Sequence, residues 1–161
     1  MTNQVKELVS ILQDQNKIYN ALIDLSKELK QAVKDNNIEE VDMLVKVESA
    51  LSMKFSVKEN KRKQLAKAIQ ETYGIDSESF SLSELKKHLN SEDQRVIEKA
   101  QTDLIHSMKT LDEINASNHM LIQSRLDWID LSMKVLGQSK QKNYTKDKKS
   151  AMENKMVDEV I

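Results

Sequence analysis

The amino-acid sequence predicts an all-α protein, an elongated antiparallel bundle of three long helices with a short connector helix and a flexible C-terminal tail. Its 161 residues include no proline and only two glycines, Gly74 and Gly137, each placed where a long patterned stretch stops, as expected for residues that close helices. Apolar residues recur in alternating steps of three and four, the period of left-handed coiled coils. Charged residues make up 32% and apolar residues 39% of the chain, which favours thin, half-exposed helices over a compact core.

The composition also limits the classes of function. The net charge of −1 gives no global field that would select nucleic acid or a membrane surface. The absence of cysteine removes thiolate chemistry and cysteine-based metal sites. A chain so poor in glycine and proline has few of the tight turns that form catalytic loops. We therefore expect a protein that is not an enzyme and that uses no cofactor.

The chain is expected to be cytoplasmic, without stable insertion in a membrane. It begins with an amphipathic pattern and lacks the uninterrupted apolar core of a signal peptide. Its apolar runs all fall short of the roughly 18 residues needed to span a bilayer.

The first long helix is predicted over residues 3–34. One apolar row follows the coiled-coil period, and a second row runs beside it at intervals of seven. Two adjacent rows are wider than a dimer seam, so this helix is expected to touch two neighbours. The first row comprises Val5, Leu8, Leu12, Gln15, Tyr19, Leu22, Ser26, Leu29 and Val33, and the second comprises Ile11, Ile18, Leu25 and Ala32.

The other helix boundaries are predicted from capping residues. The second long helix is expected over residues 38–73 and a short connector helix within residues 75–90. The third long helix is expected from Ser91 to Leu136, which divides the chain into a bundle domain, 1–137, and a tail, 138–161. The residues that carry these signals are Asn37 with Glu40, Gly74, Ser81 with Glu84, Ser91 with Gln94, and Gly137.

The third helix changes character along its length. In its second half, a second apolar row at strict intervals of seven lies roughly 60–100° around the helix from the first stripe. The first half lacks this row, so helix formation does not require it, and we interpret it as a partner-binding surface. Trp128 suits an interface anchor and a bundle core equally well. The row comprises Ile114, Leu121, Trp128 and Val135, with Ile122 and Ile129 at its edge.

Two asparagines interrupt the main stripe of the third helix. Asn115 and Asn118 fill the two steps between Leu111 and Ile122. Asparagine in a helix seam lowers stability and usually fixes the register or hydrogen-bonds a partner. Both interpretations, a register device and a partner contact, stay open from the sequence.

The tail, residues 138–161, is expected to be mobile in the free protein. Residues 138–150 hold five lysines and one aspartate, and a few apolar residues at helical spacing follow. Segments of this kind commonly fold on a partner. Here the segment would dock on a partner protein or cover the partner-binding surface of the third helix. It can equally fold back on the second apolar row of that helix. The apolar residues are Met152, Met156, Val157, Val160 and Ile161.

Two further clusters have more ordinary explanations. Asp103 and His106 form one carboxylate–histidine pair, but a di-iron bundle needs a second pair and further glutamates, so no metal site is expected. The bases of Lys58–Lys67 are consistent with an anionic partner. They are also consistent with a solvated helix face, and the near-zero net charge favours this second interpretation.

The third helix carries the segment Glu113-Ile-Asn115-Ala-Ser-Asn118-His-Met-Leu121-Ile122, followed by Ser124-Arg-Leu126-Asp-Trp128-Ile129. An asparagine pair spaced by three, followed by a Leu-Ile-x-x-x-Leu-x-(aromatic)-Ile run, resembles the signature region of the FlgN family. The stretch Leu44-x-x-x-Glu48-x-x-Leu51, with Glu59-x-x-Arg62, is similar to the second helix of that family.

This resemblance implies a cytosolic chaperone of flagellar type III export. Such a chaperone binds the amphipathic terminal segments of hook-associated proteins, prevents their premature assembly and delivers them to the export apparatus. The cargo segment would dock on the widened face of residues 114–136 as a helix in a groove. The resemblance also assigns Tyr144 to partner binding, although lysines follow it where many members have a glycine.

Two alternatives remain from the sequence. A generic coiled-coil scaffold or adaptor would self-associate through its seams, and homo-oligomer formation is left open. A nucleic-acid or membrane-surface binder would use Lys58–Lys67 and the lysines of residues 140–149, and its binding would collapse with salt.

Overall fold

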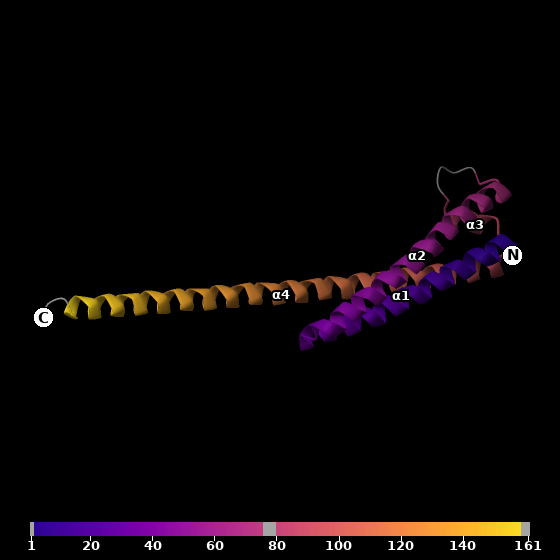
Figure 1. Ribbon diagram of the computed structural model, residues 1–161. Coiled ribbons are helices and arrows are strands. Elements are labelled where there is room, and N and C mark those ends of the chain that lie inside the picture. The colour runs from indigo at the N-terminus through magenta and orange to yellow at the C-terminus, as the bar shows by residue number, and fades with distance from the viewer. Residues whose placement is uncertain (1, 76–79, 159–161) are drawn as a thin grey trace. The chain divides into compact units, whose positions relative to one another are not determined.

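In the computed structural model every described element is a helix (Figure 1). The structure describes the backbone of residues 2–75 and 80–158 and the side chains of residues 2–75 and 80–136. The prediction of an all-α chain is confirmed over this part. The chain divides into two compact units, Met1–His119 and Met120–Ile161, and each is described by itself. The helices are α1 (Asn3–Asp35), α2 (Ile38–Tyr73), α3 (Leu82–Lys87) and α4 (Ser91–Asp158).

Helix α1 begins and ends at polar caps, within one residue of the predicted bounds. The Thr2 hydroxyl accepts a hydrogen bond from the Val5 backbone N–H at 3.4 Å, which satisfies one of the free donors of the first turn. At the other end, Asn36 adopts a left-handed conformation with φ of 54°. Its N–H donates to the carbonyls of Ala32 and Val33, so the chain reverses directly after the helix.

Helix α2 shows the two caps that the sequence predicts. The Asn37 side chain accepts from the Glu40 backbone N–H at 3.2 Å, as in a capping box. The Glu40 carboxylate returns the contact to the Asn37 side-chain amide at 2.8 Å, and the Asn37 backbone N–H donates instead to the Ala32 carbonyl. At the C-terminus, Gly74 has φ of 62° and its N–H donates to the Gln70 carbonyl.

The start of α4 corrects the predicted cap. Ser81 caps α3, as expected, but its hydroxyl accepts from the Ser83 N–H and the Glu84 carboxylate accepts from Lys87. Asn90, not Ser91, caps α4. The Asn90 Oδ1 accepts from the Asp93 N–H at 2.8 Å, and Asn90 competes well because asparagine is among the strongest N-caps. The Gln94 side chain does not bond back to Ser91, as the predicted capping box would require. Its amide instead donates to the carbonyls of Lys86 and Leu89, and it thereby joins the end of α3 to the first turn of α4.

The predicted end of the third helix at Leu136 is also wrong. Helix α4 passes through Gly137 and continues to Asp158. A glycine inside a helix costs only about 1 kcal/mol relative to alanine. The lysine, glutamine, methionine and glutamate residues that follow are good helix formers. The side chains of this segment lie outside the described residues, and the mobility of the tail stays a prediction.

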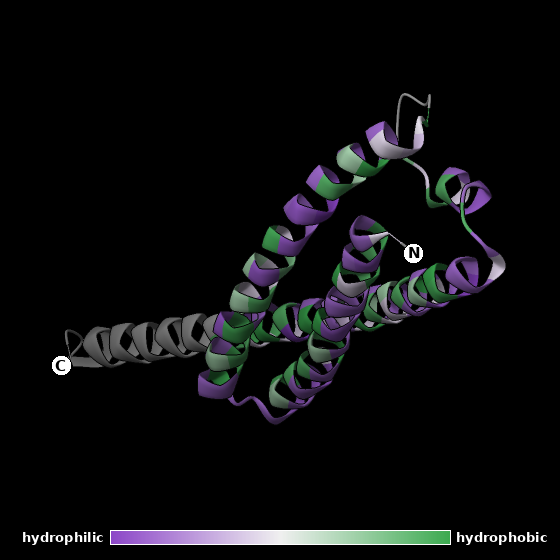
Figure 2. Cartoon of the chain, turned by 90° about the vertical axis from the view of Figure 1, so that its right-hand side faces the viewer, coloured by the Kyte–Doolittle hydropathy of each residue, from purple (hydrophilic) through white to green (hydrophobic). Residues whose placement is uncertain are grey.

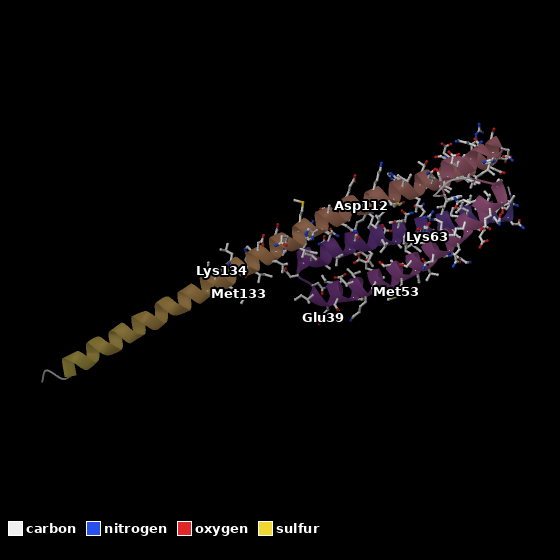
Figure 3. All side chains as sticks on the ribbon, turned by 90° about the horizontal axis from the view of Figure 1, so that it is seen from above. Glu39, Met53, Lys63, Asp112, Met133 and Lys134 are labelled. Atoms are coloured by element: carbon white, nitrogen blue, oxygen red, sulfur yellow. The ribbon has the colours of Figure 1, made fainter. Side chains whose placement is uncertain are left out.

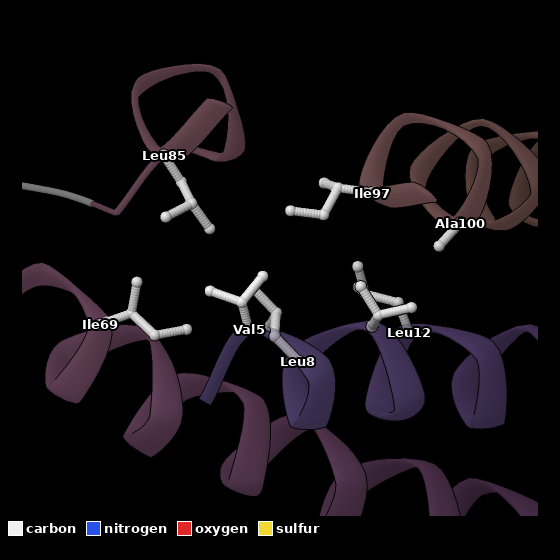
Figure 4. Packing of buried hydrophobic residues seen from close by; sticks show 8 residues of the cluster. Val5, Leu8, Leu12, Ile69, Leu85, Ile97 and Ala100 are labelled. Atoms are coloured by element: carbon white, nitrogen blue, oxygen red, sulfur yellow. The ribbon is translucent and has the colours of Figure 1, made fainter. Parts of the chain in front are cut away.

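The core of residues 2–119 is built around α1. Figure 4 shows its largest cluster, in which α1 meets α2, α3 and the first turns of α4. Hydrophobic residues follow stripes along the helices (Figure 2), as the heptad pattern predicts. Because fully burying one Leu or Ile side chain contributes about 1.5–3 kcal/mol, this cluster holds the four helices together. Its buried members are Val5, Leu8, Val9, Leu12, Ile69, Leu85, Ile97 and Ala100.

Gly74→Ala tests the α2 stop. Nothing lies within 4 Å of a Cβ placed there, so the only cost is the left-handed backbone. We expect the free energy of unfolding to fall by about 1 kcal/mol, measured by urea denaturation. The matched variant Asn36→Gly relieves the same strain at the α1 stop and is expected to leave stability unchanged or raise it slightly. A Gly74→Ala protein as stable as the wild type would contradict this account.

Candidate partner-binding surface

The structure separates the members of the predicted second row. Ile114 is half-buried and packs against the cluster of Leu22, Ile23 and Leu111. Leu121 is half-buried, whereas Trp128 and Val135 are 65% and 58% exposed. The row therefore begins as a core contact in residues 2–119 and ends as an exposed apolar surface further along α4.

The main stripe of α4 is exposed over the same stretch. Side chains of residues 120–136 that the heptad pattern would place in a seam face solvent, among them Met133, labelled in Figure 3. A helix that is apolar on more than one side is normally buried against other elements, so this surface has the character of a binding face. The exposed stripe comprises Ile122, Leu126, Ile129, Met133 and Leu136.

The two asparagines contact α1. The Ser26 hydroxyl donates to the Asn115 Oδ1 at 3.0 Å, and the Asn118 amide donates to the Ser26 carbonyl at 2.7 Å. Beside them, the Lys30 ammonium donates to the Ser117 hydroxyl at 2.9 Å. These contacts support the register interpretation, because they pair one turn of α1 with one turn of α4. The Asn118 Oδ1 is buried without a hydrogen-bond partner. Partner contact by these asparagines stays a proposal, and the side chain of Tyr144 lies outside the described residues.

The basic cluster of α2 is largely neutralised by the protein itself. Lys58 pairs with Asp14 at 2.7 Å and Lys61 with Glu7 at 3.8 Å. The Lys58 hydrogen bond holds the pKa of Asp14 below its ordinary value, although burial opposes this. These intramolecular pairs leave the anionic-partner hypothesis with little support, because few of the clustered charges remain unmatched.

A polar network that sequence reasoning missed joins α1 to α2. Gln15 is 1% exposed and its amide donates to Glu59 at 3.0 Å. Arg62 donates to both oxygens of Glu59, at 2.8 and 2.7 Å. The hydrogen bonds from Arg62 lower the pKa of Glu59, burial raises it, and the hydrogen bond from Gln15 lowers it further. The hydrogen bonds to Glu59 also raise the pKa of Arg62. The available signal was Gln15 itself, a glutamine inside an apolar row.

The described residues contain neither a metal-binding cluster nor a membrane-spanning helix. No group of three or more histidine, cysteine, aspartate or glutamate side chains there is placed to hold a metal ion. Over the same residues, none of the helices combines the length and apolar character needed to cross a membrane.

An exposed apolar stripe on the longest of the described helices, as on residues 120–136 of α4, is typical of helical proteins that bind segments of other proteins. The chain matches the family model described as FlgN protein over residues 1–151, and it belongs to the FlgN family. This is a family of flagellar chaperones. The resemblance carried by the third helix is thereby confirmed. No curated protein and no solved structure matches the chain.

Asn118→Ala tests the register interpretation. It removes the hydrogen bond to the Ser26 carbonyl, and we expect the free energy of unfolding to fall by about 1 kcal/mol, measured by chemical denaturation. The matched control is Asn115→Ala, a change at an exposed residue whose partner hydroxyl can rotate to another acceptor. It is expected to cost less. Equal stability of Asn118→Ala and the wild type would argue against a structural role.

The Glu59 network predicts a pH dependence of stability. The pKa of Glu59 lies below its ordinary value of 4.5 in the folded protein. Its stabilisation is therefore complete above about pH 4.5 and is lost as the pH falls through the lower folded value. Urea unfolding from about pH 7 to pH 3 should show this decline. In Glu59→Gln the stability at neutral pH should be lower and the decline smaller, with the remainder due to Asp14. Parallel declines in both proteins would contradict the assignment.

Proposed function

We propose that this chain is a cytoplasmic export chaperone for hook-associated proteins. It binds the amphipathic terminal segments of these proteins, prevents their premature assembly and delivers them to the type III export apparatus. The proposal includes an antiparallel bundle of three long helices as the scaffold. Membership in the FlgN family over residues 1–151 supports it.

The observation that carries the proposal is the exposed apolar face of α4 within residues 120–136. Trp128, Ile129 and Val135 are 65%, 49% and 58% exposed. Exposing such side chains in water is unfavourable, since each apolar Å² removed from water is worth about 25 cal/mol. A surface of this kind is retained when another protein covers it.

A terminal cargo helix suits this surface physically. The exposed apolar residues of α4 recur at intervals of three and four residues. A ridge of apolar side chains on an amphipathic helix can therefore pack between them. A cargo segment that is disordered when free must be ordered on binding, and that entropic cost offsets part of the contact energy. The resulting affinity is modest, which permits release at the export apparatus. Residues 138–161, with Tyr144, are proposed to contribute to docking there.

Trp128→Ala tests the surface. We expect the chain's affinity for a synthetic peptide of a hook-associated protein terminus to fall about 30-fold, the equivalent of a 2 kcal/mol hot spot. Isothermal titration calorimetry measures the change. A thermal melt of the same variant should match the wild type, because an exposed side chain contributes little to folding.

Met53→Ala provides the matched control, since Met53 is 69% exposed on α2. It should bind the peptide as the wild type does. An unchanged affinity in Trp128→Ala would remove this surface from the proposal. The coiled-coil scaffold would instead be favoured if the wild type does not bind the peptide but self-associates stably, and if Trp128→Ala abolishes that self-association.

A further inference from the structure

A cleft of about 440 Å³ opens between α2 and α4 over the middle of α1, within residues 2–119. Tyr19 and Phe55 lie in its wall with their rings in edge-to-face contact, 5.0 Å between centroids. Ile105 and Met108 of α4 form its opposite side and are 43% and 41% exposed. The cleft therefore has an apolar wall that the chain itself leaves partly uncovered.

Helix α3 shows what kind of element fits this space. At the N-terminal end of α1, the fully buried Leu85 of α3 packs in the cluster that also contains Ile69 of α2 and Ile97 of α4 (Figure 4). Leu82, on the first turn of α3, reaches the edge of the cleft. Beyond Leu82 the space between α2 and α4 continues without a helix from the described part of this unit. A second helix carrying leucine-type side chains would fill it as α3 does.

One buried oxygen in the cleft wall lacks a hydrogen-bond donor within the described part of the chain. Gln15 lies in the cleft wall, and its Oε1 is buried with no hydrogen-bond partner among the described residues. Its Nε2 donates to the Glu59 carboxylate. Rotation of the amide would place its oxygen against that carboxylate, so the acceptor orientation is fixed by charge. A buried acceptor left unsatisfied is unfavourable, and a donor on an incoming side chain can satisfy it after a small local adjustment.

The uncompensated charge beside the cleft comes from Asp112, which is not part of its wall but lies one turn of α4 beyond Met108, a residue of that wall. Burial raises the pKa of Tyr19, and the neighbouring carboxylates of Asp112 and Glu59 raise it further. Arg62 offsets the charge of Glu59. Asp112, labelled on α4 in Figure 3, forms no ion pair within the described part of the chain. A cation is therefore the complementary group at this border of the cleft, and a helix lying in the cleft would exclude water from beside Asp112 and strengthen the attraction.

We propose that this cleft is a docking site for a helix of a second protein, which places leucine-type side chains against Tyr19 and Phe55 and a lysine or arginine toward Asp112. The site is separate from the α4 surface of the proposed function and concerns a second partner. Such a helix combines apolar side chains for the space left open beyond α3 with a cation for Asp112 at its border.

Three synthetic peptides of about 18 residues, roughly 27 Å as a helix, test the proposal. They share one leucine stripe and differ at a single bordering position, which is lysine, glutamine or glutamate. Fluorescence anisotropy with the full chain should give an affinity about tenfold higher for the lysine peptide than for the glutamate peptide, and added salt should reduce this difference.

Two variants assign the binding to the cleft. Asp112→Lys should reverse the preference in favour of the glutamate peptide. Ile105→Glu, at a side chain already partly exposed, should abolish binding while its circular dichroism and melting temperature stay near those of the wild type. Met53→Glu and Trp128→Glu serve as controls on two other exposed apolar positions, and both should bind the lysine peptide normally.

Several results would overturn the proposal. One is equal affinity for the lysine and glutamate peptides, and another is binding that persists in Ile105→Glu. Loss of binding in Trp128→Glu would move the peptide site to the α4 surface. Sedimentation showing self-association that Ile105→Glu abolishes would assign the cleft to a second copy of this chain.

Discussion

The burial of α1 against its neighbours is the interaction on which the rest of residues 2–119 depends. Eleven side chains of α1 are buried, against three of α2, so α1 is the helix that the others cover. Its two apolar rows explain this role, since they are wide enough to meet α2 and α4 at once. The caps at Thr2 and Asn36 set its ends, and the short turn after Asn36 returns α2 along it.

Polar residues within these contacts determine how the helices align. Apolar heptads alone permit slippage by a heptad, because every repeat offers a similar surface. Gln15 with Glu59 and Ser26 with Asn118 pair single positions on α1 with single positions on α2 and α4. Ser107 adds a third point, donating to the Asn16 Oδ1 at 2.7 Å. A shift of register breaks each of these hydrogen bonds and leaves buried polar groups unpaired. The contacts therefore penalise other registers more than they stabilise the native one.

The apolar side chains of the protein divide between a buried core and an exposed surface. In residues 2–119 the apolar rows of α1 are buried, and they hold α2, α3 and the start of α4. Within residues 120–136, α4 keeps apolar side chains exposed, where folding gains nothing from them. This division suits a family of chaperones, because a binding surface that is not part of the core can bind and release cargo without unfolding the scaffold. The cleft beside Gln15 follows from a different cause, since α3 is too short to fill the space between α2 and α4.

The helices and most of their ends were predictable from the sequence, because caps and heptads act over three to seven residues. Asn37, Gly74 and Ser81 each carry a local signal, and each caps a helix in the structure. The row that contains Trp128 was also predictable, as apolar residues in excess of what the helix requires, but the sequence left open whether Trp128 is buried or exposed. Where two local signals competed, the prediction was wrong. Asn90 caps α4 in place of Ser91, and helix propensity carries α4 through Gly137.

Only the tertiary structure decided which distant side chains meet. Asn115 and Asn118 looked equally suited to a partner and to a register contact, and their position beside Ser26 is set by how α1 lies on α4. The pairing of Gln15 with Glu59 and the cleft beyond α3 arise in the same way, since both depend on the spacing between helices far apart in the sequence. Local periodicity determines which face of a helix is apolar. The packing of one helix against another determines which parts of that face are covered.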